Sequence, residues 1–464
     1  MITSRNLVRP LPLILLLAAT CWSAIVNGRN VLSSPPTQAE RLPPAKSVES
    51  AHRAELQGAA SCASMACHNA NGPKGSWRSE YTTWAAYDAH AKAYEALFDK
   101  KSSDIAKNLR DPIPAHENRL CLNCHVQPGW PDVRPGPRFS KEDGVGCECC
   151  HGAAQNWKTE HYKWSQSSPP AKEGFKDRHG MVRTEGLTAR AETCVACHVG
   201  SAIADVNHDL IAAGHPRLNF EFGAYHANLP HHWRDDKDKA GRLDFEARAW
   251  VIGQLVSAKA ALALLAARAE EKGSKTWPEF AEYDCFACHH DLQNESWRRR
   301  TQPGRKIGSL SWGSWYTSML LFAAAAIRGQ DDQLLRSQLA DLQAEMHKPR
   351  LDRRRVAEQA KKLADKLAGL TKDFDQLRFT PDRLAELAGT IRRARQASEN
   401  GSWDSATQYY LTLAALVQAR KDCDRSYRDP DLEASLSAMV KQLQFPVGYD
   451  SPRDDSQSWQ RKIP

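Results

Sequence analysis

In the second half of the chain, apolar residues recur at intervals of three and four, which is the spacing of amphipathic helices. The clearest stripe lies within residues 242–272 and ends before Gly273. It consists of Ala247, Trp250, Val251, Leu255, Ala258, Leu262 and Leu265. Comparable stripes predict further helices over residues 314–327, 354–370, 384–397, 402–419 and 432–443. The stripes beyond residue 300 predict an antiparallel helical bundle over residues 301–448.

The first half of the chain follows a different pattern. Prolines and glycines interrupt residues 131–200 so often that loops are expected there. An exception is residues 79–98, SEYTTWAAYDAHAKAYEALF, where aromatic residues and alanines recur at helical spacing. The predicted fold class is mainly α, with a loop-rich domain over residues 56–300 followed by the helical bundle.

The two ends of the chain carry neither pattern. Residues 1–28 combine two arginines with an apolar run over residues 11–22, which predicts a signal peptide; an uncleaved membrane anchor is the alternative. Residues 29–55 are rich in Pro, Ser and charge and predict a flexible linker, and the polar residues 449–464 predict a disordered tail. We therefore expect a periplasmic or otherwise exported protein, with membrane association only through the N-terminal segment.

Ten of the 13 cysteines fall in five motifs that each end in histidine. Four motifs are strict C-x-x-C-H pentads, and one has four residues between its cysteines. In chain order, and called the first to fifth motif below, they are Cys62/Cys67/His68, Cys121/Cys124/His125, Cys147/Cys150/His151, Cys194/Cys197/His198 and Cys285/Cys288/His289. C-x-x-C-H is the signature of c-type haem attachment, in which the cysteines bind the macrocycle covalently and the histidine is the proximal iron ligand. The sequence predicts about five covalently attached haem c groups.

Other uses of these cysteines fit the pattern less well. A disulfide framework would not require a histidine directly after each cysteine pair. A zinc site would not require the same pentad four times. For the first motif, a single thioether through Cys67 is the fallback, because its spacer is longer. Cys21, Cys149 and Cys423 remain outside the motifs.

Histidines outside the motifs are candidates for the second, distal ligand of each iron. Residues 201–235 contain five histidines and no attachment motif, a density that a surface loop does not need. The predicted distal ligands are His90, His161, His208, His215, His232 and His290. His116 is either a ligand or a flanking residue, and His179 is expected in solvent. An iron with two histidine ligands is six-coordinate and offers no open position to a substrate.

The formal net charge of +8 would fit binding to nucleic acid or to a membrane surface. Five haems, however, would bring roughly ten propionate charges, partly offset by ferric iron. Lysines and arginines beside propionates are the simpler explanation, so no nucleic-acid partner is expected. Buried macrocycles would also supplement a core that is lean at 41% hydrophobic residues.

Residues 60–200 resemble the cytochrome c-554 family of multihaem cytochromes. The resemblance lies in TTWAAYDAHAKAYEAL after the first motif, LCLNCHV, GVGCECCHG and ETCVACHVG. It implies a helical and loop fold with closely stacked haem pairs, in which His90 and His161 are distal ligands of haems remote in sequence. The family has four haems, one without a distal ligand, and by motif order the corresponding haem here is that of His125. The longer first spacer, the fifth motif and the helical bundle depart from the family.

Two functions are compatible with these motifs. The leading expectation is a relay of single electrons along closely packed, mostly bis-histidine haems, with redox partner proteins that the sequence does not identify. The alternative is a haem oxidoreductase acting on a small nitrogen or sulfur compound at one five-coordinate haem. The chain has no C-x-x-C-K motif, which argues against the familiar pentahaem nitrite-reductase arrangement. A docking role for the helical bundle is a third hypothesis.

Overall fold

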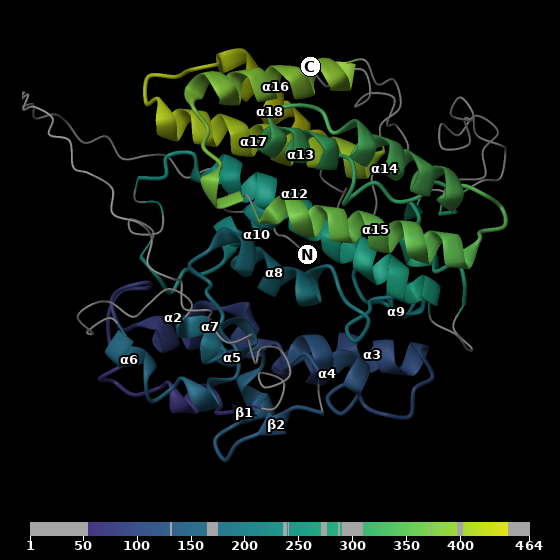
Figure 1. Ribbon diagram of the computed structural model, residues 1–464. Coiled ribbons are helices and arrows are strands. Elements are labelled where there is room, and N and C mark those ends of the chain that lie inside the picture. The colour runs from purple at the N-terminus through teal and green to yellow at the C-terminus, as the bar shows by residue number, and fades with distance from the viewer. Residues whose placement is uncertain are drawn as a thin grey trace, which may run out of the picture. The chain divides into compact units, whose positions relative to one another are not determined.

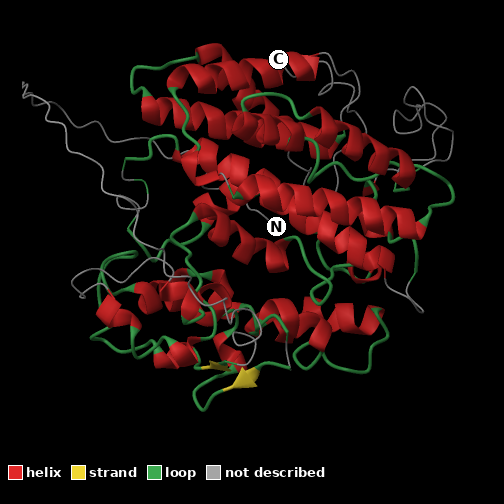
Figure 2. Cartoon of the chain, viewed as in Figure 1, coloured by secondary structure: helices red, strands yellow, loops and turns green. Residues whose placement is uncertain are grey.

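The computed structural model describes residues 54–129, 132–164, 175–234, 239, 241–270, 276–285, 288–289, 310–372, 374–396 and 402–443. Within these residues the chain is mainly helical, which confirms the predicted fold class (Figure 2). Two short strands, β1 Glu55–Leu56 and β2 Arg134–Pro135, form a parallel pair. The predicted signal peptide, most of the linker, the polar tail, Cys21 and His290 lie outside the described residues.

Short helices joined by loops make up the described chain before residue 230 (Figure 1). They are η1 Ala59–Ser61, α2 Glu80–Tyr87, η2 Ala89–Lys92, η3 Glu95–Phe98, α3 Lys100–Asn108, α4 Arg119–His125, η4 Lys141–Asp143, α5 Cys147–His151, η5 Ala154–Asn156, α6 His161–Trp164, α7 Phe175–Arg178, α8 Leu187–His198, α9 His208–Ala212 and α10 Phe222–Asn228. The aromatic segment 79–98 is divided among α2, η2 and η3. The break lies at Asp88, because its carboxylate accepts the His90 N–H at 3.0 Å and so competes with continued helix.

Longer helices follow residue 240. They are α12 Phe245–Glu270, the short η6 Phe280–Glu282, α13 Leu320–Arg328, α14 Gln333–Met346, α15 Arg353–Thr371, the short η9 Phe374–Gln376, α16 Pro381–Gln396, α17 Trp403–Cys423 and α18 Pro430–Leu443. Local signals set their ends, as at α15, where the Asp352 carboxylate accepts the Arg355 N–H, and at α13, which stops at Gly329 with φ 71°. The helices predicted from apolar stripes are confirmed, except that residues 314–319 form turns and α13 begins only at Leu320.

Helix α12 is the long helix predicted within residues 242–272. It packs against α8, α10, α13, α15 and α17, so apolar residues occupy nearly all of its sides. Among the described residues it is the one helix long and apolar enough to cross a membrane, yet 78% of its most apolar window is buried inside the protein. A helix covered in this way is typical of a protein core.

One apolar core joins the two halves of the described chain. It runs from Leu187 in α8 to Leu443 in α18 and includes α12. Buried hydrogen bonds reinforce it, since Trp250 Nε1 in α12 donates to Thr412 Oγ1 in α17 at 2.9 Å. The domain boundary predicted at residues 300 and 301 lies outside the described residues, and this core draws on both sides of it.

Candidate haem-binding sites

The attachment motifs lie on single turns of backbone. The second, third and fourth motifs occupy α4, α5 and the end of α8, and the cysteine–cysteine–histidine spacing places the three side chains on one turn. In the fifth motif the His289 N–H donates to the Cys285 carbonyl at 2.8 Å. In the first, the His68 N–H donates to the Ser64 carbonyl at 3.0 Å, so the longer spacer still ends in a turn before the histidine.

The attachment cysteines differ in how far the protein covers them. Six of the ten are half-buried, and the other four are exposed: Cys67, Cys150, Cys285 and Cys288. In the fifth motif both cysteines and His289 are exposed.

The fifth motif has the turn that attachment needs. The Cys288 N–H donates to the Cys285 carbonyl at 3.3 Å. A thioether joins the edge of the macrocycle and does not require protein around the sulfur atom, so an exposed thiol is compatible with attachment. Attachment of haem through Cys288 stays a prediction.

Four of the five motif histidines face another imidazole. The ring centroids are separated by 6.0 Å for His68 and His161, 5.9 Å for His198 and His90, 6.3 Å for His151 and His232, and 6.4 Å for His289 and His208. Two imidazoles that bind one metal from opposite sides, each at about 2 Å, place their ring centroids about 6 Å apart. The spacing therefore fits one iron between each pair.

The remaining motif histidine, His125, has His215 in its vicinity. Burial and repulsion from His125 both lower the pKa of His215, which places the two rings within electrostatic reach of each other. Four motif histidines are thus matched by ring distance with a histidine predicted as a distal ligand, and His215 is the candidate for the fifth, His125. His290 was also predicted as a distal ligand and lies outside the described residues.

The Nδ1 atoms of six of these histidines lie near an oxygen atom. The partners are Glu80 for His68 (3.0 Å), Asp88 for His90 (2.9 Å), the Ala93 carbonyl for His125 (2.7 Å), Thr184 for His151 (3.4 Å), the Lys158 carbonyl for His161 (2.7 Å) and the Pro216 carbonyl for His215 (2.9 Å). An acceptor on Nδ1 fixes the tautomer and leaves Nε2 as the metal-binding nitrogen. The sequence alone did not predict these partners. Only Asp88, two residues before His90, could have been found from its position near a candidate ligand.

The electrostatic surroundings of the imidazoles are of two kinds. Burial lowers the pKa of His151 and of His198 to about 4, so both rings are neutral, the form that binds metal. The hydrogen bond that His90 donates to Asp88 raises the pKa of His90, and the one that His68 donates to Glu80 raises the pKa of His68. A carboxylate behind Nδ1 makes the imidazole a stronger metal ligand.

Three other histidines have different surroundings. The Nε2 atom of His226 accepts a hydrogen bond from Arg190 at 2.8 Å, and Nε2 of His231 donates to the His226 carbonyl at 2.8 Å. The ring of His116 stacks on Phe98 with centroids 4.4 Å apart. The structure therefore does not place these three side chains opposite a motif histidine.

Cysteines of different motifs touch one another. The thiols of Cys62 and Cys147 are hydrogen-bonded, as are those of Cys124 and Cys197. The first motif therefore adjoins the third, and the second adjoins the fourth. Cys149, outside the motifs, donates its thiol to the Val126 carbonyl at 3.2 Å and acts as a packing residue.

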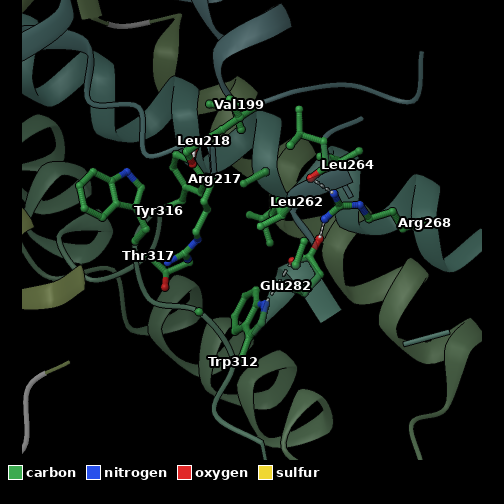
Figure 3. Close-up of a pocket in the computed structure, with 16 residues that line it drawn as sticks. Val199, Arg217, Leu218, Leu262, Leu264, Arg268, Glu282, Trp312, Tyr316 and Thr317 are labelled. Carbon is green, nitrogen blue, oxygen red and sulfur yellow. Dashed lines mark hydrogen bonds and ion pairs between the residues drawn. The ribbon is translucent and has the colours of Figure 1, made fainter. Parts of the chain in front are cut away.

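A cavity lies beside the fifth motif (Figure 3). Its walls include Leu262, Trp312, Tyr316, Arg217 and Arg268, and it is partly open to solvent. Arg217 pairs with Asp404 of α17 at 3.0 Å and interacts electrostatically with Cys285. Arg268 pairs with Glu282 at 2.6 Å (Figure 3). Sequence reasoning did not single out either arginine.

Elsewhere, apolar side chains near the motifs are unusually exposed, as for Met65 (67%) and Tyr87 (61%). Large apolar groups bound beside them would cover such surfaces.

Among the described residues, no group of three or more His, Cys, Asp or Glu side chains is gathered so that it could hold a metal ion. The residues present fit haem, whose porphyrin supplies the remaining iron ligands.

These features are those of a c-type cytochrome, a protein that carries covalently bound haem c. Residues 61–152 match the sequence model of the family described as cytochrome c554 and c-prime. Cytochrome c-554 of Nitrosomonas europaea is 30% identical over 154 residues, which are 32% of this chain and 58% of that protein. The chain therefore resembles the cytochrome c-554 family and spans somewhat over half of this relative. No solved structure gives a significant match.

Proposed function

We propose that this chain is an exported multihaem cytochrome that relays single electrons along about five haems, most of them held by two histidines. The observation that carries the proposal is the set of paired imidazoles with centroids 5.9–6.4 Å apart. When bound, haem supplies an iron that changes its charge by one electron. The chain's own part is to hold each iron from both sides.

An iron bound by histidine on both sides is better suited to electron transfer than to catalysis. A six-coordinate iron has no open position for a substrate and needs little rearrangement when its charge changes. The carboxylates behind Nδ1 of His68 and His90 fix the orientation of these rings and increase their basicity. They adjust the affinity of the two sites for an electron without entering the reaction.

The contacts between motifs support transfer from haem to haem. Cys62 and Cys147 are in contact, and so are Cys124 and Cys197, so the macrocycles attached to each pair would have edges close together. Because the haems are attached covalently, little protein is needed between them. The electrons would enter from and leave to redox partner proteins, whose identity the proposal does not specify.

The second candidate is an oxidoreductase that uses one five-coordinate haem for a small nitrogen or sulfur compound. The site where an open position would fall by motif order is that of His125. His215, whose pKa is lowered by burial and by repulsion from His125, is the candidate that would close this site.

Export of the chain is part of the proposal. It is supported by the apolar run at residues 11–22, typical of a signal peptide, and by haem c attachment, which takes place outside the cytoplasm. Fractionation of cells expressing the full chain tests it. The haem-containing protein should appear in the periplasmic fraction, or in the membrane fraction if the N-terminal segment stays as an anchor.

Intact-mass spectrometry combined with ferric-state electron paramagnetic resonance (EPR) tests the relay. Five haem additions and only low-spin signals are expected. Four additions, with the first motif unmodified, would remove Cys62 and Cys67 from the assignment, and four with the fifth motif unmodified would remove Cys285 and Cys288. A stoichiometric high-spin signal in the resting protein would favour the oxidoreductase instead.

A further inference from the structure

The ring of His198, in the fourth motif, packs against two aromatic side chains. Phe220 lies on its face, with ring centroids 5.4 Å apart and planes at 22°, and Tyr225 of α10 meets it at 5.1 Å and 66°. Phe220 and Tyr225 also contact each other, with centroids 4.7 Å apart. Phe220 is 1% exposed, so the surrounding core holds it in place. Rotation of the His198 ring would bring it against Phe220.

The ring opposite His198 has a fixed orientation as well. His90 lies at 81° to His198, and Nδ1 of His90 donates to the Asp88 carboxylate at 2.9 Å. A hydrogen bond thus sets the plane of one ring, and aromatic packing sets the plane of the other. The two imidazole planes are therefore held nearly perpendicular.

Side chains beyond residue 310 hold the segment that contains Phe220. Trp315 Nε1 donates to the Phe220 carbonyl at 2.8 Å. Tyr316 Oη donates to the Leu218 carbonyl at 2.9 Å. These two carbonyls lie in a stretch without regular secondary structure, so the bonds from Trp315 and Tyr316 supply partners that a helix or a strand would otherwise provide.

Helix α17 supports this segment in turn. Trp315 stacks on Trp403, the first residue of α17, with centroids 5.8 Å apart and planes at 20°. Asp404, the next residue of α17, pairs with Arg217 at 3.0 Å. The beginning of α17 therefore contacts residues 217–220 directly and also through Trp315.

We propose that the helical bundle positions an axial ligand of the fourth haem: through Trp315 and Phe220 it holds the imidazole plane of His198 nearly perpendicular to that of His90. The axial ligands are one of the means by which a protein tunes a haem iron. The inference rests on the proposed relay, because His90 and His198 must share one iron. It gives the bundle a role inside the protein that does not require a docked partner.

Ferric EPR of the full-length holoprotein reads the ring orientation. In a low-spin haem the angle between the two imidazole planes sets the splitting of the iron d orbitals, and nearly perpendicular planes give an unusually large g value. Such signals are expected from His90 with His198 at 81° and from His151 with His232 at 73°. His90→Ala should convert one of these signals to high spin and so identify the signal of the fourth haem.

Phe220→Leu tests the aromatic contact. It removes the ring stacked on His198 and should shift the largest g value of the fourth haem downwards, while intact mass shows all five haems retained. Phe222→Leu is the matched control, because Phe222 is equally buried at 1% exposure but packs on His226. Its spectrum should match that of the unmodified protein.

Trp315→Phe tests the link to the bundle. It keeps an aromatic ring, removes the donor to the Phe220 carbonyl and should shift the same signal in the same direction. Trp403→Phe is the matched control, since its indole donates to the Leu443 carbonyl of α18 at 3.1 Å. Tyr316→Phe, which deletes only a hydroxyl group, replaces Trp315→Phe if that variant does not fold.

An unchanged signal in Phe220→Leu or in Trp315→Phe would overturn the proposal, and so would equal shifts in a variant and its control. The relay would stand in each case. If His90→Ala produces no high-spin iron, the pairing of His90 with His198 in the proposed relay is wrong instead. The two failures are therefore distinguishable.

Discussion

The carboxylate of Glu148 accepts a hydrogen bond from the backbone N–H of Gly58 at 2.8 Å, although 90 residues separate the two in the chain. The same carboxylate accepts the N–H groups of Gln57 at 2.9 Å and of Ala154 at 2.6 Å. Gly58 has φ 78°, and a Cβ there would clash with the Arg138 carbonyl. Glu148, the second residue of the third motif, thus holds the backbone that leads into the first motif.

Replacing Glu148 by alanine should destabilise this junction. Three N–H groups would lose their acceptor, and each buried donor left unsatisfied costs about 1–3 kcal/mol. We expect the free energy of unfolding in urea to fall by at least about 3 kcal/mol, with loss of haem from the first motif. Glu142→Ala is the control, because Glu142 is exposed and contacts only nearby residues. A loss no greater than that of the control would contradict the role assigned to Glu148.

The hydrogen bond between Asp88 and His90 should set the potential of one haem. Asp88→Asn removes the anionic partner of Nδ1, so the ligand becomes less basic and the ferric state less stabilised. We expect the potential of the haem at His90 and His198 to rise by about 60 mV, the equivalent of a tenfold change in a one-electron equilibrium.

Spectroelectrochemistry of the holoprotein measures this shift. Asp104→Asn removes one charge at an exposed position paired with Lys100, and its potentials should stay close to those of the unmodified protein. Equal shifts in the two variants would mean that net charge, not the hydrogen bond, sets the potential.

The ion pair of Arg217 and Asp404 should couple the cavity wall to α17. Asp404 is 4% exposed, and its charge raises the pKa of Arg217 despite the opposing effect of burial. Asp404→Ala leaves the half-buried Arg217 guanidinium without its buried partner and should cost up to about 3 kcal/mol of unfolding free energy, since water still reaches part of the arginine. The double variant Arg217→Met/Asp404→Leu should recover most of that loss.

Urea unfolding compares these variants with an exposed pair. Arg336→Ala breaks the exposed pair with Asp331 and should cost under about 1 kcal/mol. If the double variant is as unstable as Asp404→Ala, the cost does not arise from the unpaired arginine.

Asp332 should make part of the bundle's stability depend on pH. It accepts the Leu335 N–H at the start of α14 and pairs with Lys366 of α15 at 3.1 Å. Burial opposes its ionisation, but the two hydrogen bonds and the Lys366 charge outweigh burial and lower its pKa from 3.8. A carboxyl with a lowered folded pKa contributes stability above its unfolded pKa and loses it as pH falls through the folded pKa.

Asp332→Asn keeps the helix cap and removes the charge, so it should cost about 1 kcal/mol near neutral pH. The difference from the unmodified protein should shrink below pH 3.8, as urea titrations at several pH values would reveal. Asp365→Asn, at an exposed position on α15, should show no such trend. A difference independent of pH would argue against the ionised form as the stabilising one.

Much of the helical architecture could be predicted from local spacing. The stripe that includes Trp250 and Leu255 predicts α12, because packing of a helix depends mainly on which residues share a face. The break in the helix at Asp88 could not be predicted in this way. Apolar spacing gives no information about a carboxylate that hydrogen-bonds to the backbone next to it. The role of Glu148 could not be predicted either, because two of its three donors, Gln57 and Gly58, lie in a segment far away in the chain.

By itself, the sequence determined the attachment chemistry of this protein. Cysteines three apart with an adjacent histidine fit on one turn of backbone, so the motif is complete within a few residues. Only the tertiary structure decided which histidines face one another, as His161 faces His68 and His232 faces His151. These partners lie far apart in the chain, and packing between elements, not local spacing, brings their rings together.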